Sequence, residues 1–239
     1  MDHGGGTTAR DALPSAADGP GAVDAMDSVG RQLGSSERLK ALSDGVFAII
    51  LTILVLELKV PPHLPHKSLL EAFHELRPTL VAWVISFLIT GMYWVAHRDI
   101  FARVRTVSRD LVWLNLLFLL PCALIPFAAS VLGEYPEDSK AIQLYGVVLI
   151  LCSLLRLSLY GYVVRHPAHL WPGALGDHSG LAYLLVMLPI VVYLVAMVVG
   201  AASPGAAAII FLAVPAIYFL AVTVARVRSD ASSEVEDFS

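Results

Sequence analysis

The sequence predicts an all-α membrane protein with six transmembrane helices, on the evidence of its apolar composition, its low charge and its pattern of apolar segments. Of the 239 residues, 57% are hydrophobic and 15% are charged, and the mean hydropathy is +0.72. A soluble domain carries charge on about a quarter of its residues, so a soluble fold is excluded. The net charge of −4 leaves no cationic excess of the kind that binds nucleic acid.

Six apolar segments each approach the roughly 20 residues that a helix needs to cross a bilayer. They run over residues 42–60, 78–96, 111–133, 141–164, 181–202 and 206–225. Polar residues or Pro and Gly separate them, and the Ser203-Pro204-Gly205 turn divides the last two. We therefore expect a six-helix transmembrane domain over residues 38–228.

Both ends of the chain have the composition of disordered tails. The first 36 residues hold seven glycines and show no apolar periodicity, so we expect a disordered cytoplasmic tail over residues 1–37. Residues 229–239 carry four acidic residues and no basic one, which predicts a second, acidic tail. Neither tail is expected to belong to the functional unit.

The distribution of Lys and Arg predicts that both termini lie in the cytoplasm, because short cytoplasmic loops retain cationic side chains. With the N-terminus inside, ten cationic residues fall on the inner side and four on the outer side. The inner set is Arg31, Arg38, Lys40, Arg98, Arg103, Arg105, Arg109, Arg165, Arg226 and Arg228. The outer set is Lys59, Lys67, Arg77 and Lys140.

The first span is the least hydrophobic, because Asp44 and Glu57 lie inside it. A charge at mid-membrane costs about 2.5 to 3.5 kcal/mol, so an acid buried there needs a protein partner or access to water. On a helical wheel one stripe of this span is apolar apart from a single hydroxyl. The stripe comprises Gly45, Ile49, Thr52, Ile53 and Leu56. This pattern suits a helix that lies against protein or lines a pathway.

The fourth span carries a lone arginine, Arg156. A voltage sensor normally has several arginines at three-residue spacing, so steep voltage gating is not expected. We expect Arg156 to pair with a carboxylate or with helix carbonyls in another span.

The run from Arg38 to Gly45 closely resembles the R-x-x-x-F-S-D-G signature of the transmembrane protein 175 family of potassium channels, with Leu42 in place of the motif's Phe. Trp94 and His97 are similar to that family's W-x-x-H element, and the run from Trp113 to Phe127 is similar to its third-span sequence. The resemblance covers residues 38 to about 225.

The resemblance implies a potassium channel and not an enzyme, with no catalytic residue and no cofactor besides permeant K⁺. It implies a homotetramer in the cell membrane, with the first helix of each chain lining the pore. The family's constricting side chains follow the signature Asp by five, eight and twelve residues, which gives Ile49, Thr52 and Leu56. Ile49 and Leu56 would form a hydrophobic constriction, and Thr52 would favour potassium over sodium.

Without the resemblance, these three residues could have other roles than lining a pore. Ile49 and Leu56 could be ordinary packing residues, and the Thr52 hydroxyl could bond to the carbonyl one turn back. No segment of the chain resembles the T-V-G-Y-G filter of ordinary potassium channels.

A polar network is expected near the cytoplasmic end of the first span, and we expect it to fix the rotation of the pore helix. Its members are Arg38, Ser43, Asp44, Trp94 and His97. Trp94 and His97 are three residues apart and share one helix face, which the resemblance places against the signature motif. The alternative for His97 is a merely interfacial histidine.

Two other functions remain open: a proton-coupled transporter or proton pathway that uses Asp44 and His97, and a membrane scaffold without flux. Transporters often contain helices broken near the midplane, and the central-looking prolines here are Pro189 and Pro215.

No metal site is expected, because His166, His169 and His178 lack acids or cysteines at ligand spacing. Cys122 and Cys152 lie in apolar runs, where a thiol behaves as a small hydrophobic group, and no disulfide is expected.

Overall fold

The computed structural model describes residues 20–59, 68–173 and 179–236, and these residues form helices. The long helices are α1 (Pro20–Ile53), α2 (Leu69–Ala102), α3 (Arg109–Cys122), α4 (Ile125–Glu134), α5 (Ser139–Arg165), α6 (Ser179–Gly200) and α7 (Pro204–Glu236). Two 3₁₀ turns, η1 (Leu54–Glu57) and η2 (Pro167–His169), follow α1 and α5. Within this described part, five segments are long and apolar enough to cross a membrane, and α6 adds a shorter apolar stretch, Val186–Gly200. The predicted all-α membrane fold is confirmed.

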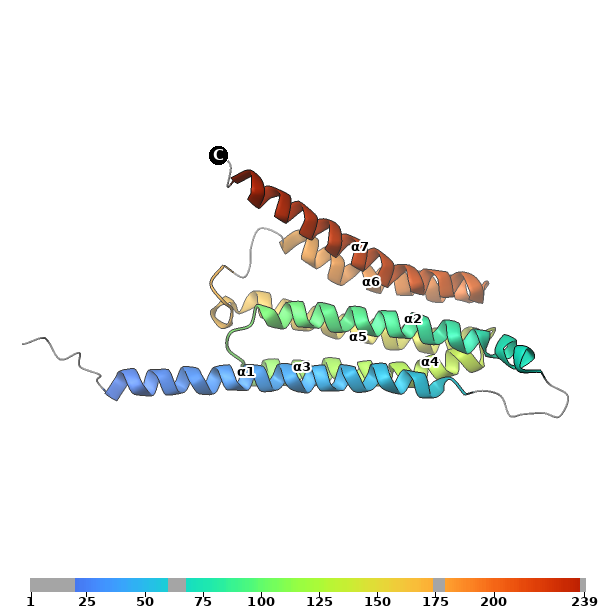
Figure 1. The fold of residues 1–239 in the computed structure, drawn as a ribbon, viewed down its shortest axis with the longest axis horizontal. Helices are drawn as coiled ribbons and strands as arrows, with labels where there is room; N and C mark the ends of the chain where they lie inside the picture. Colours follow the sequence, from blue (N-terminus) through green and yellow to red (C-terminus); the bar gives the residue numbers. More distant parts are fainter. Residues whose placement is uncertain (1–19, 60–67, 174–178, 237–239) are drawn as a thin grey trace, which may run out of the picture.

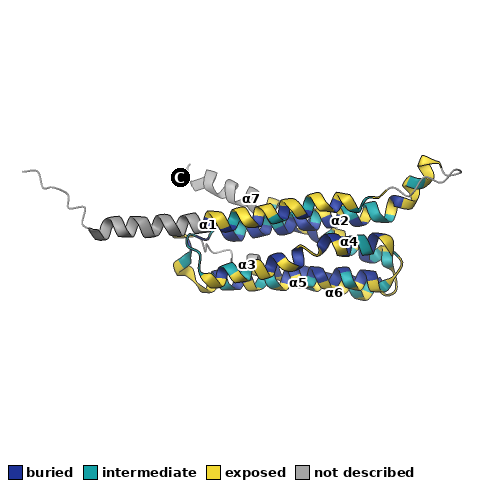
Figure 2. Cartoon of the chain, turned by 90° about the horizontal axis from the view of Figure 1, so that it is seen from below, coloured by how far each residue is buried: buried dark blue, intermediate teal, exposed yellow. Residues whose placement is uncertain are grey.

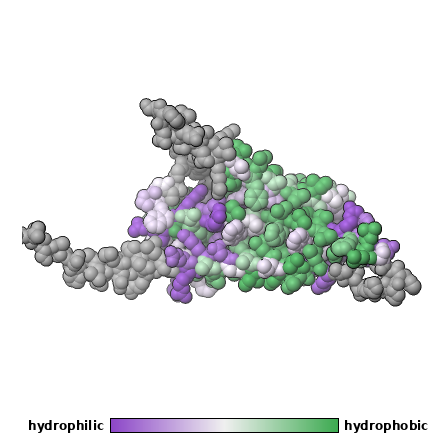
Figure 3. Space-filling view, in the orientation of Figure 1, coloured by the Kyte–Doolittle hydropathy of each residue, from purple (hydrophilic) through white to green (hydrophobic). Residues whose placement is uncertain are grey.

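The helices run side by side along one axis, with α1 on one flank and α6 and α7 on the other (Figure 1). Helix α2 packs against α1, α4 and α7, while α5 packs against α3, α4 and α6. The start of α1 and the end of α7 lie at the same end of the bundle, as an even number of crossings requires. Apolar side chains form a band around the middle of the molecule, with hydrophilic residues at both ends (Figure 3). Such a band matches the hydrocarbon core of a bilayer.

Polar side chains cap the N-termini of α2, α3 and α5, and at α3 the Ser108 hydroxyl accepts from the Leu111 N–H at 3.1 Å. The Ser68 hydroxyl accepts a hydrogen bond from the Glu71 backbone N–H at 3.3 Å, and the Glu71 carboxylate accepts one from the Ser68 N–H at 2.8 Å. This capping box lets α2 begin nine residues before Pro78, where the sequence predicted the span to start. At α5 the Asp138 carboxylate accepts from the Lys140 N–H at 2.8 Å.

The third span is interrupted, whereas the sequence predicted one continuous helix over 111–133. Helix α3 ends at Cys122 and α4 begins at Ile125. Pro126 has no N–H to donate to the Cys122 carbonyl, and its ring crowds that carbonyl, so the helix is broken there. Helices α6 and α7 continue through Pro189 and Pro215. Neither of these two central-looking prolines therefore produces a broken helix of the kind common in transporters.

Helices also enter the segments expected to be tails. Helix α1 starts at Pro20 and α7 ends at Glu236. The remainder of both expected tails, residues 1–19 and 237–239, lies outside the described residues, and so do Lys67 and His178.

Arg156 has a partner in another span. Its side chain is 1% exposed, its Nη2 donates to the Val186 carbonyl of α6 at 3.3 Å, and its guanidinium lies 5.8 Å from the Tyr93 ring centroid. Pro189 lies three residues after Val186, so the guanidinium reaches the helix turn from which the proline removes a backbone donor. Of the two kinds of partner expected from the sequence, the structure gives a helix carbonyl.

The two cysteines are buried, free thiols. Cys122 and Cys152 lie with their sulfur atoms 3.7 Å apart between α3 and α5. They pack as small hydrophobic side chains, as the sequence predicted.

Gly133 marks a close approach of α4 to α2. A Cβ placed on Gly133 would lie 2.9 Å from the Thr79 Cα, a backbone atom, and the Thr79 hydroxyl donates to the Gly133 carbonyl at 3.4 Å. We expect Gly133→Ala to destabilise the protein by about 1–3 kcal/mol through overpacking, measured as a lower melting temperature in detergent. The matched control is Gly91→Ala, where a Cβ meets nothing within 4 Å. Equal melting temperatures for the two variants would contradict the close approach.

Candidate functional site

Helix α1 has one packed face and one exposed face. Ser43, Phe47, Ile50 and Leu54 are buried on the face that packs against α2, α3 and α4. The opposite half of the helix is exposed over the part whose burial is described, from residue 37 onward (Figure 2). All five members of the stripe predicted from the sequence (Gly45, Ile49, Thr52, Ile53 and Leu56) are exposed there in the single chain.

The exposed half carries large apolar side chains. Ile49 is 58% exposed and Leu56 is 67% exposed, although both lie in the apolar band. Thr52 lies between them along the helix and is the one hydroxyl of the stripe. Packing within the single chain therefore does not explain why apolar side chains stand at positions 49 and 56.

The Thr52 hydroxyl bonds back into its own helix. Its Oγ1 lies 3.0 Å from the Ala48 carbonyl and 2.9 Å from the Ile49 carbonyl, to which it donates. This is the internal bond that the sequence left open as an alternative. Because the hydrogen is used inside the helix, the lone pairs of Oγ1 remain available on the exposed face as acceptors. A threonine in this state can offer an oxygen ligand to a cation.

The end of the stripe differs from an ideal α-helix. From Leu54 the helix tightens into the 3₁₀ turn η1, in which the Leu58 N–H bonds to the Val55 carbonyl at 3.1 Å. A 3₁₀ turn rotates successive side chains by about 20° more per residue than an α-helix. The wheel drawn from the sequence therefore holds through Ile53, and Leu56 is turned beyond its expected position.

A buried chain of hydrogen bonds ties α1 to α2 and α3. The Asn115 amide donates to the Ser43 hydroxyl at 2.9 Å, and the Ser43 hydroxyl donates to the Leu39 carbonyl at 3.0 Å. The Asn115 Oδ1 lies 2.7 Å from His97 Nε2. Because that amide oxygen can only accept, Nε2 of His97 carries the hydrogen. His97, Asn115 and Ser43 are each at most 2% exposed.

Aromatic rings surround His97. Its ring stacks on Phe101, with centroids 4.4 Å apart, and on Phe118, with centroids 5.6 Å apart and an angle of 7° between the planes. Phe47 of α1 lies 5.8 Å away on another side. The histidine is therefore held in one orientation, as part of the packing between three helices. Its burial favours a place in the polar network over the interfacial residue considered as an alternative.

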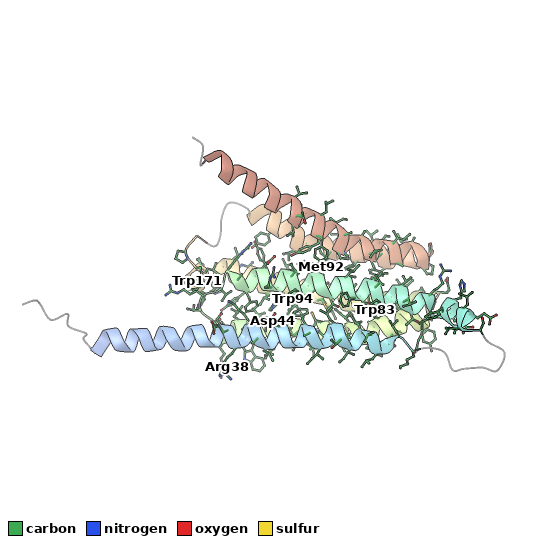
Figure 4. The ribbon with its side chains drawn as sticks, viewed as in Figure 1. Arg38, Asp44, Trp83, Met92, Trp94 and Trp171 are labelled. Carbon is green, nitrogen blue, oxygen red and sulfur yellow. The ribbon has the colours of Figure 1, made fainter. Side chains whose placement is uncertain are left out.

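Asp44 belongs to a separate, exposed set of contacts. Its Oδ1 accepts a hydrogen bond from Trp94 Nε1 at 2.9 Å, and the Arg98 guanidinium lies 5.5 Å from the centroid of the Trp94 ring. Asp44 and Trp94 face one another between α1 and α2, while Arg38 points away from α2 (Figure 4). Arg38 is exposed and makes no hydrogen bond or ion pair with the residues that the structure describes.

The five residues expected to form one network thus fall into two sets, with Arg38 outside both. Ser43 and His97 share the buried chain, and Asp44 and Trp94 share the exposed contact. Sequence reasoning missed Asn115, which connects Ser43 to His97. The signal in the sequence was an amide side chain within an otherwise apolar span. That signal is weak, because an uncharged residue changes the hydropathy of a span only slightly.

A small cavity lies where the two sets approach each other. It has a volume of about 180 Å³, and its lining includes Lys40, Asp44, His97 and Arg98. The space is large enough for several water molecules.

The histidines considered as metal ligands bond to protein groups. His169 Nδ1 lies 2.8 Å from the Thr106 hydroxyl, and His166 Nδ1 lies 2.8 Å from the Tyr162 carbonyl. Among the described residues there is no group of three or more His, Cys, Asp or Glu that could hold a metal ion.

Replacing Asn115 tests the buried chain. We expect Asn115→Leu, which is close in volume, to lower stability by about 1–3 kcal/mol for each buried group left unpaired, because both His97 and Ser43 lose a partner. The measurement is the melting temperature of the full chain in detergent. The control is Trp94→Phe, which removes an exposed hydrogen bond and should cost about 1 kcal/mol or less. A wild-type melting temperature for Asn115→Leu would count against the chain as a stabilising element.

Comparisons with known proteins agree with this arrangement. A family model described as "Endosomal/lysosomal potassium channel TMEM175" matches residues 38–126, which carry all of the site residues above. "Potassium channel B446_29190" of Streptomyces collinus is 36% identical over 137 residues, which cover 56% of this chain and 66% of that protein. "Endosomal/lysosomal proton channel TMEM175" of Gallus gallus is 33% identical over 144 residues, which cover 55% of this chain and 29% of that protein. The chain thus spans just under two thirds of the bacterial relative.

A solved structure has the same fold. It is the crystal structure of a lysosomal potassium-selective channel TMEM175 homolog from Chamaesiphon minutus, with a TM-score of 0.69 and 26% identity. The similarity covers 78% of this chain and 97% of that one. These relatives are named as channels, and none is named as an enzyme. Residues 38–126 are thus similar in sequence to the TMEM175 family, and the chain has the fold of a solved TMEM175 homolog.

Proposed function

We propose that the protein is a potassium-permeable channel of the cell membrane, in which four copies surround a pore lined by α1 and both termini are cytoplasmic. The observation that carries this proposal is the exposed half of α1, which spans the apolar band and serves no packing within the chain. Relatives named as potassium channels support it.

The charges on α1 favour an aqueous surrounding for its exposed half. Asp44 is exposed and Glu57 is half-buried, one near each end of the stripe. A carboxylate that faces hydrocarbon costs about 2.5–3.5 kcal/mol, whereas one that faces a water-filled lumen costs little. Carboxylates near both ends of the stripe therefore fit a helix beside a water-filled pore better than a helix surrounded by lipid.

A groove beside α1 gives a neighbouring copy a place to pack. It has a volume of about 510 Å³ and lies between α1 and the interrupted third span, with Ile49 on the side nearer the proposed lumen and Ile53 and Phe127 among its other lining residues. Phe127 is 60% exposed in the single chain. A cyclic assembly of four copies buries such surfaces without any further partner.

In the proposed pore, the apolar and the polar side chains of the stripe have different roles. Rings of Ile49 and Leu56 form hydrophobic constrictions that exclude ions by dewetting. Thr52, between them, supplies a ring of acceptor oxygens that replaces part of the hydration shell of K⁺. The buried chain through Ser43, Asn115 and His97 holds the rotation of α1 and so keeps these side chains aimed at the lumen.

A polar residue at the constriction should increase conduction. We expect Ile49→Asn to raise K⁺ flux into liposomes that contain the purified protein, since each lowering of the barrier by about 1.4 kcal/mol gives about a tenfold higher rate. The control is Ile209→Asn, the same substitution at a position on α7 that is 71% exposed. Equal flux through both variants would remove Ile49 from the constriction.

Thr52 can be tested by a methyl-for-hydroxyl exchange. We expect Thr52→Val to reduce the preference for K⁺ over Na⁺, because it deletes the acceptor oxygen and keeps the shape. The measurement is the reversal potential with K⁺ on one side and Na⁺ on the other. Thr223→Val is the matched control, because Thr223 makes the same bond one turn back, to the Phe219 carbonyl at 2.8 Å, on α7. Unchanged selectivity in Thr52→Val would disprove the role.

A proton pathway is the second candidate. Asp44 and His97 line the same small cavity, and several vertebrate relatives are named proton channels. The experiment that separates the candidates is flux driven by K⁺, Na⁺ or H⁺ gradients in the same liposomes, with His97→Gln as the variant. A potassium channel gives K⁺ flux that persists without a proton gradient. Proton flux that His97→Gln abolishes would favour the alternative, and no flux with any gradient would favour a scaffold.

A further inference from the structure

A second cavity lies toward the end of the bundle opposite the start of α1, and no residue of α1 lines it. Its volume is about 470 Å³, and it lies between α2, α4 and α7. Arg77, Glu137 and the Pro204-Gly205 turn form its mouth, while the deeper wall includes Ile85 and Phe211. Neither the stripe nor the hydrogen-bonded sets described above contribute to it.

The cavity changes from polar to apolar along the helix axes. On α2 the distance from Arg77 to Ile85 is eight residues, or about 12 Å of helix. On α7 the distance from Gly205 to Phe211 is six residues, or about 9 Å. The polar mouth lies beside the start of α7 and the loop between α4 and α5, where the head groups of a bilayer begin, and the apolar part reaches into the hydrocarbon. A molecule that fits must itself be polar at one end and apolar at the other.

Small residues keep the cavity open on the α7 side. A Cβ placed on Gly205 meets nothing within 4 Å, and Ala207 and Ala208 line the wall next to it. Larger side chains at these positions would fill the space.

The mouth carries two opposite charges that do not neutralise each other directly. Arg77 and Glu137 are both exposed and both line the mouth, and no ion pair joins them among the described residues. Such a pair of separated charges is complementary to a head group that contains both an anion and a cation.

We propose that this cavity binds a phospholipid whose head group carries a phosphate and a primary amine, as in phosphatidylethanolamine. The Arg77 guanidinium donates to the phosphate, and the Glu137 carboxylate accepts from the ammonium group. The first part of one acyl chain lies against Ile85 and Phe211. A head group without an amine leaves Glu137 unpaired beside a phosphate, and a trimethylated amine cannot donate a hydrogen bond to it.

Native mass spectrometry of the full-length chain in mild detergent tests the proposal, with phosphatidylethanolamine, phosphatidylcholine and phosphatidylglycerol of identical acyl chains added in turn. We expect phosphatidylethanolamine to bind about tenfold more tightly than either of the others, the ratio that one charge-assisted hydrogen bond supplies. Arg77→Gln should weaken its binding by a similar factor. Lys140→Gln, which removes a cation at the same end but outside the cavity, should leave binding unchanged.

Two further variants test whether the acyl chain enters the apolar part of the cavity and whether Glu137 contacts the amine. Ala208→Trp should block the apolar part, whereas Ile209→Trp, one residue away and 71% exposed, should not. Glu137→Gln should remove the preference for phosphatidylethanolamine over phosphatidylcholine. Equal binding of all three lipids, or wild-type binding by Arg77→Gln and Ala208→Trp, would overturn the proposal. Because the readout is the mass of bound lipid, this outcome is independent of whether the protein conducts ions.

Discussion

The structure depends on one buried polar tie, the chain of hydrogen bonds from Leu39 through Ser43 and Asn115 to His97. Helix α1 contacts the rest of the bundle along a single face, and apolar contacts alone allow such a helix to turn or slide at small cost. A fully paired polar chain in a low-dielectric interior allows one arrangement only, because any other leaves buried donors without acceptors. The direction in which α1 presents its open half follows from this chain.

Much of the fold could be predicted from the sequence, because membrane spans are read from length and hydropathy. The six crossings and the exposed stripe on the first span follow from periodicity and from the absence of charges. The break between α3 and α4 could not be predicted from the sequence. Proline is common in spans, and its effect depends on which neighbours satisfy the freed carbonyl groups. Pro189 is accommodated near the buried Arg156, while Pro126 is not accommodated within a continuous helix.

The site was predicted less completely than the fold. The family resemblance predicted that Trp94 and His97 lie near Ser43 and Asp44 of the signature run. Helix spacing does not predict how one helix is rotated against the next. The division into a buried and an exposed set, and the position of Arg38 outside both, depend on that rotation. Asn115 was overlooked because an uncharged amide barely changes the hydropathy of a span, although a buried amide needs partners as strictly as a charge does.

The internal hydrogen bond of the Thr52 hydroxyl decides whether this residue attracts cations or anions. With its hydrogen directed at the Ala48 and Ile49 carbonyl groups, Oγ1 presents only lone pairs to the exposed side of α1. An oxygen in this state is attractive to a cation and has no hydrogen to offer to chloride or another anion. A ring of such oxygens would therefore reject anions without any charged side chain at the narrowest part of a pore.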